Sequence, residues 1–179
     1  MPEITIRSAK QEDFSVLSTF EHGYYTNYVW QMSLDISSEK VRSTFQRVRL
    51  PRKVFVSYPR KREIIFDDLT QIEAILVADY GDKPVGYVKL LSHEKSGVAR
   101  ISDLVVTSLI RRQGIASGLI VASMDLSTNR GFHTLVMEVQ SKNDPAIKLA
   151  NKMGFNFCGF QDFYFPNQEM ALFFSRFTR

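Results

Sequence analysis

The feature that most constrains the fold of this chain is the stretch from Asp103 to Gly131. It begins with an apolar, β-branched run at 104–106, which is typical of a buried strand, and then crosses a basic turn at 111–114. Beyond the turn, apolar residues recur at intervals of four, three and four, as on one face of a helix: Ile115, Leu119, Ala122 and Leu126. The Asn-Arg-Gly sequence at 129–131 is a helix stop. The stretch therefore predicts a strand, a tight basic turn and a helix.

The turn before this helix has the chemistry of an anion-binding site. The first turn of a helix leaves backbone N–H groups without partners and carries partial positive charge. A glycine at the start of such a helix lets an anion approach the backbone, and a small residue two positions later serves the same purpose. We expect a pyrophosphate to be held here by residues 111–117, namely Arg111, Arg112, Gln113, Gly114, Ile115, Ala116 and Ser117.

The composition indicates one globular domain of 179 residues, 44% of them hydrophobic. No run approaches the ~18 apolar residues of a membrane span, and the first residues lack the apolar core of a signal peptide. The single cysteine, Cys158, excludes an internal disulfide, and the three isolated histidines give no metal-ligand spacing. We therefore expect a cytoplasmic protein without a metal, with Cys158 in its core.

The remaining sequence predicts a mixed sheet. Strands are expected at Glu3–Arg7, Glu73–Tyr80, Val85–Leu91, Ala99–Val106 and Thr134–Val139, and helices at Asp13–Phe20 and Ser37–Arg47. The strand at Thr134–Val139 follows a helical crossover, so it should lie parallel to its predecessor. Asp144 is expected to cap a further helix that has Pro145 at its first position and ends at Gly154, and a hairpin over 157–177 closes the chain. The fold class is thus α/β in the broad sense (α+β), with a mostly antiparallel sheet and flanking helices.

Two motifs resemble those of the GNAT family of N-acetyltransferases. Arg111-x-x-Gly114-x-Ala116 is similar to the family's coenzyme motif, and the segment Asn143-x-x-Ala146-x-x-Leu149-x-x-Lys152-x-Gly154-Phe155 resembles its second conserved block. The likeness covers residues 73–177 well and the first 70 weakly. Within the family, the 137–140 segment and the ending at 163–174 look like the streptothricin-type acetyltransferases, and a ribosomal-protein alanine type has a similar tail.

The resemblance implies a single domain over residues 1–179, with an acetyl-CoA-binding core at 73–177 and a variable, substrate-shaping part at 1–72. It implies two parallel strands that splay apart, so that backbone at Leu104, Val105 and Val106 binds pantetheine and the thioester carbonyl. It also places Asn143 on the pantetheine arm, with the helix that carries Ala146 and Lys152 beside it. We expect acetyl-CoA as the cosubstrate.

One position departs from the family pattern. Family members often carry a tyrosine after the leucine of the second helix, as general acid near the coenzyme sulfur, and this chain has Ala150 there. Tyr164 is our candidate substitute, with Asn151 or an ordered water as alternatives; Tyr164 can equally be a packing aromatic.

A general base is also needed, because an ammonium must lose a proton before it attacks. In an extended strand Asp103 would lie between Ile101 and Val105 on one face, where a carboxylate must be hydrogen-bonded or raised in pKa. Asp103 is therefore our first candidate and Glu138, between apolar neighbours, the second. Asp103 can equally hold a bulge or a turn.

The acceptor stays open. We expect a small-molecule amine, with an aromatic segment at 21–30 as either a core face or a substrate wall. Alternatives are a protein N-terminus or lysine, or a non-catalytic domain that binds CoA or nucleic acid. Residues 40–62 carry nine Lys and Arg and no acid, and such a block can bind nucleic acid, flank the coenzyme 3′-phosphate or face water. We do not expect a nucleic-acid or membrane partner, and a homodimer is compatible with the sequence.

Overall fold

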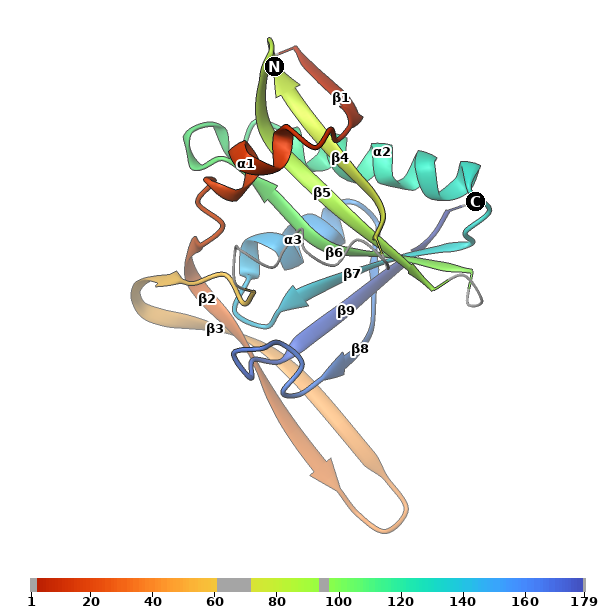
Figure 1. Ribbon diagram of the computed structural model, residues 1–179. Coiled ribbons are helices and arrows are strands. Elements are labelled where there is room, and N and C mark those ends of the chain that lie inside the picture. Colours follow the sequence, from red (N-terminus) through yellow and green to blue (C-terminus); the bar gives the residue numbers. More distant parts are fainter. Residues whose placement is uncertain (1–2, 61–71, 94–96, 179) are drawn as a thin grey trace.

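The computed structural model describes residues 3–60, 72–93 and 97–178, and is built on a seven-stranded sheet with the order β1-β4-β5-β6-β7-β9-β8 (Figure 1). The strands of this sheet are β1 (Ile4–Ser8), β4 (Ile72–Tyr80), β5 (Lys83–His93), β6 (Val98–Val106), β7 (Thr134–Gln140), β8 (Asn156–Gln161) and β9 (Ala171–Phe177). The helices are α1 (Asp13–Ser18), the short 3₁₀ turn η2 (Ser108–Ile110), α2 (Ile115–Asn129) and α3 (Asp144–Lys152). A separate hairpin consists of β2 (Tyr24–Ile36) and β3 (Val41–Val56).

All described pairings in the sheet are antiparallel except that of β6 with β7. These two strands pair only from Val98 with Thr134 to Ile101 with Met137, and they separate over their last residues. The mixed sheet and the parallel pair joined through α2 are therefore confirmed, as is the splaying of that pair. The gap that results lies beside the start of α2.

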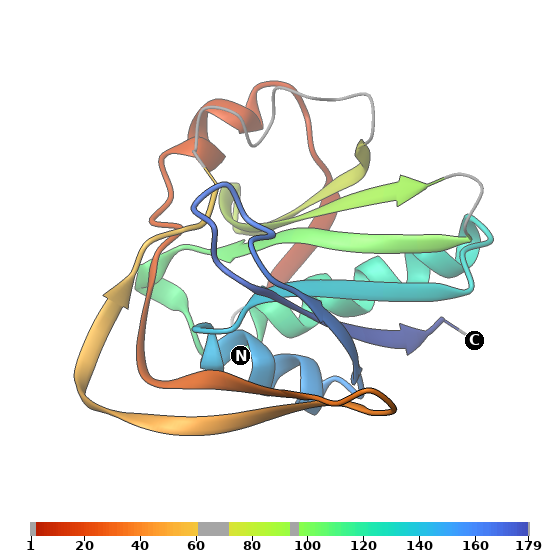
Figure 2. The ribbon, with the colours of Figure 1, turned by 90° about the horizontal axis from the view of Figure 1, so that it is seen from below.

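Helices cover both faces of the sheet. Helices α2 and α3 lie on one face and α1 on the other (Figures 1 and 2). On β4, Leu76 and Ala78 belong to the core under α2 and α3, whereas Ile75 and Val77 belong to the core under α1. This alternation buries both faces of the central strands, which is why they read as nearly continuous apolar runs.

A bulge in β6 changes which residues share a face. Lys89 pairs with Asp103 and Leu90 with Ile101, so Ser102 is the extra residue. Ile101 consequently lies in the α2 core, whereas Asp103 points to the opposite face with Val105. The expectation that Asp103 sits between Ile101 and Val105 is therefore wrong, because the bulge reverses the alternation.

The helix expected at Ser37–Arg47 is also wrong: this segment is the turn of the β2–β3 hairpin and the first part of β3. Val41 and Phe45 are four residues apart and would share one face of a helix, but this spacing also keeps two residues on one face of a strand. Phe45 packs against Phe157 and Phe160 of β8, at ring-centroid distances of 5.3 and 5.2 Å. The long hairpin extends along and beyond the body of the molecule (Figure 1).

Cys158 was expected in the core, and the structure places it at the surface. The register between β8 and β9 shifts between Phe157 and Gly159, so Cys158 is the unpaired residue of a bulge.

Candidate active site

A cavity of about 480 Å³ opens where β6 and β7 separate, between the start of α2, helix α3 and the segments at 22–24 and 58–60. Twelve residues that the sequence assigned to the coenzyme line it: Leu104, Val105, Val106, Arg111, Arg112, Gly114, Ile115, Ala116, Ser117, Asn143, Ala146 and Lys152. Gln113, Asp103 and Tyr164 do not. The two motifs, distant in sequence, thus contribute to one cavity.

The start of α2 has the geometry of an anion cradle. Gly114 is its N-cap residue with φ of 87°, a left-handed conformation that favours glycine, and no side chain caps this end. The N–H groups of Ile115, Ala116 and Ser117 therefore belong to an uncapped first turn on the cavity wall. A diphosphate fits this site, because an anion can accept hydrogen bonds from these donors at the positive end of the helix.

Arg111 lies at the cavity, but its guanidinium has protein partners. It donates to the backbone carbonyls of Val106 at 2.8 Å and Gly23 at 2.9 Å, and also to that of Glu21. Partial burial lowers the pKa of Arg111 from its ordinary value. Arg111 thus ties the start of β2 to the end of β6, in addition to placing positive charge near the cradle.

The N-cap of helix α3 lies one residue earlier than the sequence predicted. Asn143, not Asp144, is the N-cap, because its Oδ1 accepts a hydrogen bond from the N–H of Ala146 at 3.1 Å. The Asp144 carboxylate instead accepts hydrogen bonds from Arg47 of β3 at 2.6 and 3.0 Å. The hairpin is thereby anchored to the first turn of α3.

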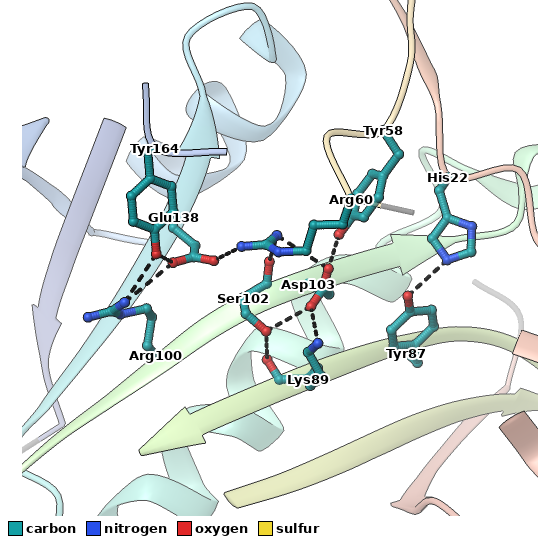
Figure 3. Close-up of polar contacts among 10 residues, drawn as sticks. All are labelled: His22, Tyr58, Arg60, Tyr87, Lys89, Arg100, Ser102, Asp103, Glu138 and Tyr164. Carbon is teal, nitrogen blue, oxygen red and sulfur yellow. Dashed lines mark hydrogen bonds and ion pairs between the residues drawn. The ribbon is translucent and has the colours of Figure 1, made fainter. Parts of the chain in front are cut away.

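On the sheet face opposite α2, buried charges surround Asp103 (Figure 3). The Asp103 side chain is fully buried and pairs with Lys89 Nζ at 2.9 Å, while the hydroxyls of Ser102 and Tyr58 donate to it. Burial disfavours its charge, but Arg60 and Lys89 outweigh burial, so the pKa of Asp103 lies below its usual range. The sequence analysis expected a buried Asp103 to be either hydrogen-bonded or raised in pKa, and the structure shows the hydrogen-bonded carboxylate.

Glu138 is the other buried carboxylate of this cluster, and unlike Asp103 it lines the cavity. It alternates with Met137 and Val139 of the α2 core, so its side chain points to the same face as that of Asp103. Arg60 Nη2 and the Tyr164 hydroxyl donate to it. Burial dominates over these partners and raises the pKa of Glu138 above its ordinary value.

Tyr164 lies beside Glu138, outside the set of cavity-lining residues (Figure 3). Burial and the Glu138 charge raise the pKa of Tyr164 to about 12, so its hydroxyl stays protonated at neutral pH. Ala150 is fully buried in the apolar core. Glu138 is therefore the connection between the Tyr164 hydroxyl and the cavity.

Sequence reasoning did not single out four further cavity residues: His22, Tyr24, Tyr58 and Arg60. The first two belong to the aromatic segment at 21–30, which the sequence offered as either a core face or a substrate wall. Tyr24 is buried and its hydroxyl donates to Gln140 at 3.0 Å. Tyr58 and Arg60 come from the end of the basic block, of which residues 61–62 lie outside the described residues. That block is not one patch, because Arg47 and Arg60 are partly buried and form ion pairs with Asp144 and Glu138, whereas Arg52 faces water.

A family model described as the acetyltransferase (GNAT) family matches residues 40–155. The chain belongs to the GNAT family of acetyltransferases. The cosubstrate of this family is acetyl-CoA. The first turn of α2 is available for its diphosphate, and the gap between β6 and β7 is available for its pantetheine.

Solved GNAT structures share the fold over nearly the whole chain. A nourseothricin acetyltransferase superposes with a TM-score of 0.82 at 19% identity, covering 98% of this chain and 99% of that one. A Bacillus anthracis (strain Ames) protein named as a streptothricin acetyltransferase, solved with acetyl coenzyme A, gives a TM-score of 0.78 at 19% identity, covering 98% of each chain. The ribosomal-protein-S18-alanine N-acetyltransferase of Escherichia coli gives 0.67 at 17%, covering 98% of this chain and 94% of that one.

One curated relative matches over a shorter stretch. N-alpha-acetyltransferase 30 of Schizosaccharomyces pombe is 34% identical over 64 residues, which are 36% of this chain and 41% of that protein. The match thus spans less than half of that relative. Separately, none of the helices in the described ranges is long and apolar enough to cross a membrane.

Proposed function

We propose that this GNAT protein transfers the acetyl group of acetyl-CoA to a primary amine of a small molecule. The observation that carries the proposal is that one cavity, at the point where β6 and β7 separate, is lined both by the start of α2 and by Glu138. An uncapped helix start lies at one end of the cavity, and the buried carboxylate of Glu138 lies on the cavity wall where β6 and β7 have separated. A thioester held between the strands would meet an amine approaching from the Glu138 face.

The chemistry needs three contributions from the chain. Acetyl-CoA supplies the activated thioester, held by the first turn of α2 and by the edges of the splayed strands. Glu138 takes a proton from the acceptor ammonium, and the neutral nitrogen then bonds to the thioester carbonyl carbon. The backbone N–H of Val106 is our candidate to stabilise the oxyanion, because the N–H of Thr107 donates to Val85 of β5 and successive N–H groups of a strand point to opposite edges. The C–S bond breaks, and the products are the N-acetylated amine and the coenzyme thiol.

Glu138 suits the role of base better than Asp103. Glu138 lines the cavity and its raised pKa makes it a stronger base than an ordinary glutamate. Asp103 is enclosed by Lys89, Tyr58 and Arg60, and its pKa is lowered. We therefore assign Asp103 a positioning role on Arg60 and Tyr58, whereas Glu138 is the catalytic residue.

The departing thiolate must recover a proton, and in the absence of a tyrosine at position 150 Tyr164 remains our candidate source; its hydroxyl does not line the cavity, so its proton would reach the sulfur by way of Glu138. Its hydroxyl is hydrogen-bonded to Glu138, so a proton that Glu138 takes from the amine can replace the one that Tyr164 gives up. The nitrogen loses two protons in all: one leaves through Glu138 to solvent before attack, and the other, lost after attack, passes to Glu138 and replaces the proton given to the thiolate, so Glu138 and Tyr164 return to their starting states.

A small acceptor is favoured by the walls of the cavity. Aromatic rings line it: Phe165 from the C-terminal part, and Tyr24 and Tyr58, which support the proposal that the part before residue 73 shapes the acceptor site. The nourseothricin and streptothricin names of the two structural neighbours agree with a cationic small molecule. The match to N-alpha-acetyltransferase 30 favours one second candidate, the N-terminus of a peptide.

The test is thiol release from acetyl-CoA with a panel of cationic antibiotics, polyamines and short peptides, with mass spectrometry of the acceptor. We expect release that depends on an amine, together with one added acetyl group on that amine. Release without acetylated product, or no release with any amine by a protein that binds acetyl-CoA, would contradict the proposed activity.

A further inference from the structure

Arg60 is a positively charged side chain placed inside the acceptor side of the cavity. Its guanidinium donates to the Ser102 carbonyl at 2.9 Å and to Glu138, and lies 3.4 Å from Asp103 Oδ1. Its Cζ lies 5.1 Å from the ring centroid of Phe165, a cation–π arrangement. The side chain is only 17% exposed. One cation therefore fills the space between the two buried carboxylates (Figure 3).

Neither carboxylate depends on Arg60 alone for a countercharge. Asp103 also pairs with Lys89 at 2.9 Å, and Glu138 also lies 3.6 Å from Arg100 and accepts from Tyr164. Removing a sole partner from a buried ion pair leaves an uncompensated charge and is strongly destabilising. Here the departure of Arg60 would leave each carboxylate with a cation, so the structure allows one cation to be exchanged for another.

The Arg60 guanidinium occupies the position beside Glu138 that the ammonium group of an acceptor must reach. A proton can move to Glu138 only from an ammonium within hydrogen-bond distance of its carboxylate. If Arg60 stayed between Asp103 and Glu138, such an ammonium would meet a like charge in a buried site, which is unfavourable.

We propose that Arg60 is an internal stand-in for the acceptor, and that the ammonium or guanidinium group of a cationic ligand binds by displacing it from the site formed by Glu138, Asp103 and Phe165. This inference rests on the proposed function for the identity of the acceptor, but the cation site itself can be tested by binding alone. The site selects ligands whose cationic group fits between two carboxylates and against an aromatic ring.

The first experiment follows Arg60 by ¹⁵N NMR of the arginine side chains, with spermidine and methylguanidinium chloride as probes. Arg7 is the matched internal control, because it also bridges two carboxylates, at 2.7 Å to Asp13 and 2.6 Å to Asp79, and it does not line the cavity. We expect saturable changes in the Arg60 signal and none in the Arg7 signal. Binding of either probe to the cavity, detected by calorimetry, with an unchanged Arg60 signal would overturn the proposal.

The second experiment uses Arg60→Ala, with Arg7→Ala as the matched variant and Arg60→Met to retain the packing on Phe165. If a site must first release an internal group, its apparent Kd for a ligand is the intrinsic Kd divided by the fraction of molecules in which the site is open. Methylguanidinium, the group that the substitution removes, should therefore bind Arg60→Ala and Arg60→Met about tenfold or more tightly than the parent protein. Arg7→Ala should bind it like the parent.

Two results would contradict the displacement. One is equal or weaker binding of methylguanidinium by folded Arg60 variants, which would make Arg60 a fixed part of the site. The other is tighter binding that persists in Arg60→Ala/Glu138→Gln, since the carboxylate would then not hold the cation. Neither measurement uses acetyl transfer, so failure of this inference and failure of the proposed activity can be told apart.

Discussion

Glu138 and Asp103 lie on the same face of the sheet and share the guanidinium of Arg60, yet their pKa values move in opposite directions. Burial acts on both carboxylates and is the largest influence on each. Asp103 has Lys89 as a close second cation at 2.9 Å, whereas Arg100 is 3.6 Å from Glu138 and is partly exposed. The environment thus makes one carboxylate a permanent anion and the other a group able to take a proton.

Asp103→Asn should move the acidic limb of the pH–rate profile to lower pH without removing it. The Asp103 charge contributes to the raised pKa of Glu138, so its loss lets Glu138 ionise at a lower pH. The measurement is kcat/KM for acetyl transfer across the acidic range. Disappearance of the limb in this variant would instead make Asp103 the base, as the sequence first suggested.

Tyr164→Phe should have the opposite effect on that limb and should also slow turnover. The Tyr164 hydroxyl donates to the ionised Glu138, and this hydrogen bond opposes the rise in the Glu138 pKa. Its loss should shift the limb upward and lower kcat, because the proposed donor to the thiolate is gone. An upward shift with unchanged kcat would show that solvent protonates the thiolate; Ala150→Tyr in the same background tests whether a donor near sulfur restores the rate.

Gly114→Glu should abolish binding of acetyl-CoA, because a carboxylate would enter the cradle and repel the diphosphate. The matched control is Gly131→Glu. Gly131 also has positive φ, at 81°, with nothing within 4 Å of an added Cβ, but it lies beyond the other end of α2. Calorimetry should show loss of affinity in the first variant only. Equal affinities in two folded variants would refute the cradle.

Arg111→Ala should weaken acetyl-CoA binding by about 1–3 kcal/mol, because it removes both positive charge beside the cradle and the charge-assisted hydrogen bond that holds the end of β6 at Val106. Because Arg111 also holds Gly23 and Glu21, the variant should raise the KM for the amine as well. Arg130→Ala is the control, since Arg130 donates to the Glu73 carbonyl at 2.6 Å, at the far end of the same helix. A change confined to the amine KM would mean that Arg111 positions β2 and adds nothing to the coenzyme site.

The features predicted from sequence are those set by local rules. Gly114 and the periodic residues of α2 place a turn and a helix from neighbours a few residues apart, and the helical crossover fixes the parallel strand that follows. The hairpin at Val41 and Phe45 was missed because a spacing of four suits a helix and a strand alike. A bulge at Asp103 was one of two alternatives, and the sequence did not decide between them because nothing in the local pattern marks Ser102 as an extra residue.

The charge network was out of reach for a different reason. Tyr58 meets Asp103 across 45 residues of chain, and Arg60 meets Glu138 across 78. Such contacts depend on how the sheet and the β3 end assemble, not on any local period. Sequence could nominate Glu138 from its apolar neighbours, but only the assembled fold shows that it faces the cavity while Asp103 does not.

The most direct test of the account is the pH dependence of acetyl transfer by the parent protein and by Glu138→Gln. In the parent, the rate should rise with pH through a limb above the ordinary glutamate range, because Glu138 must lose its proton to act and burial raises its pKa. Glu138→Gln should bind acetyl-CoA normally, lose about 10²–10⁴-fold in kcat and lose that limb. A Glu138→Gln enzyme that keeps both the limb and the parental rate would contradict the central claim.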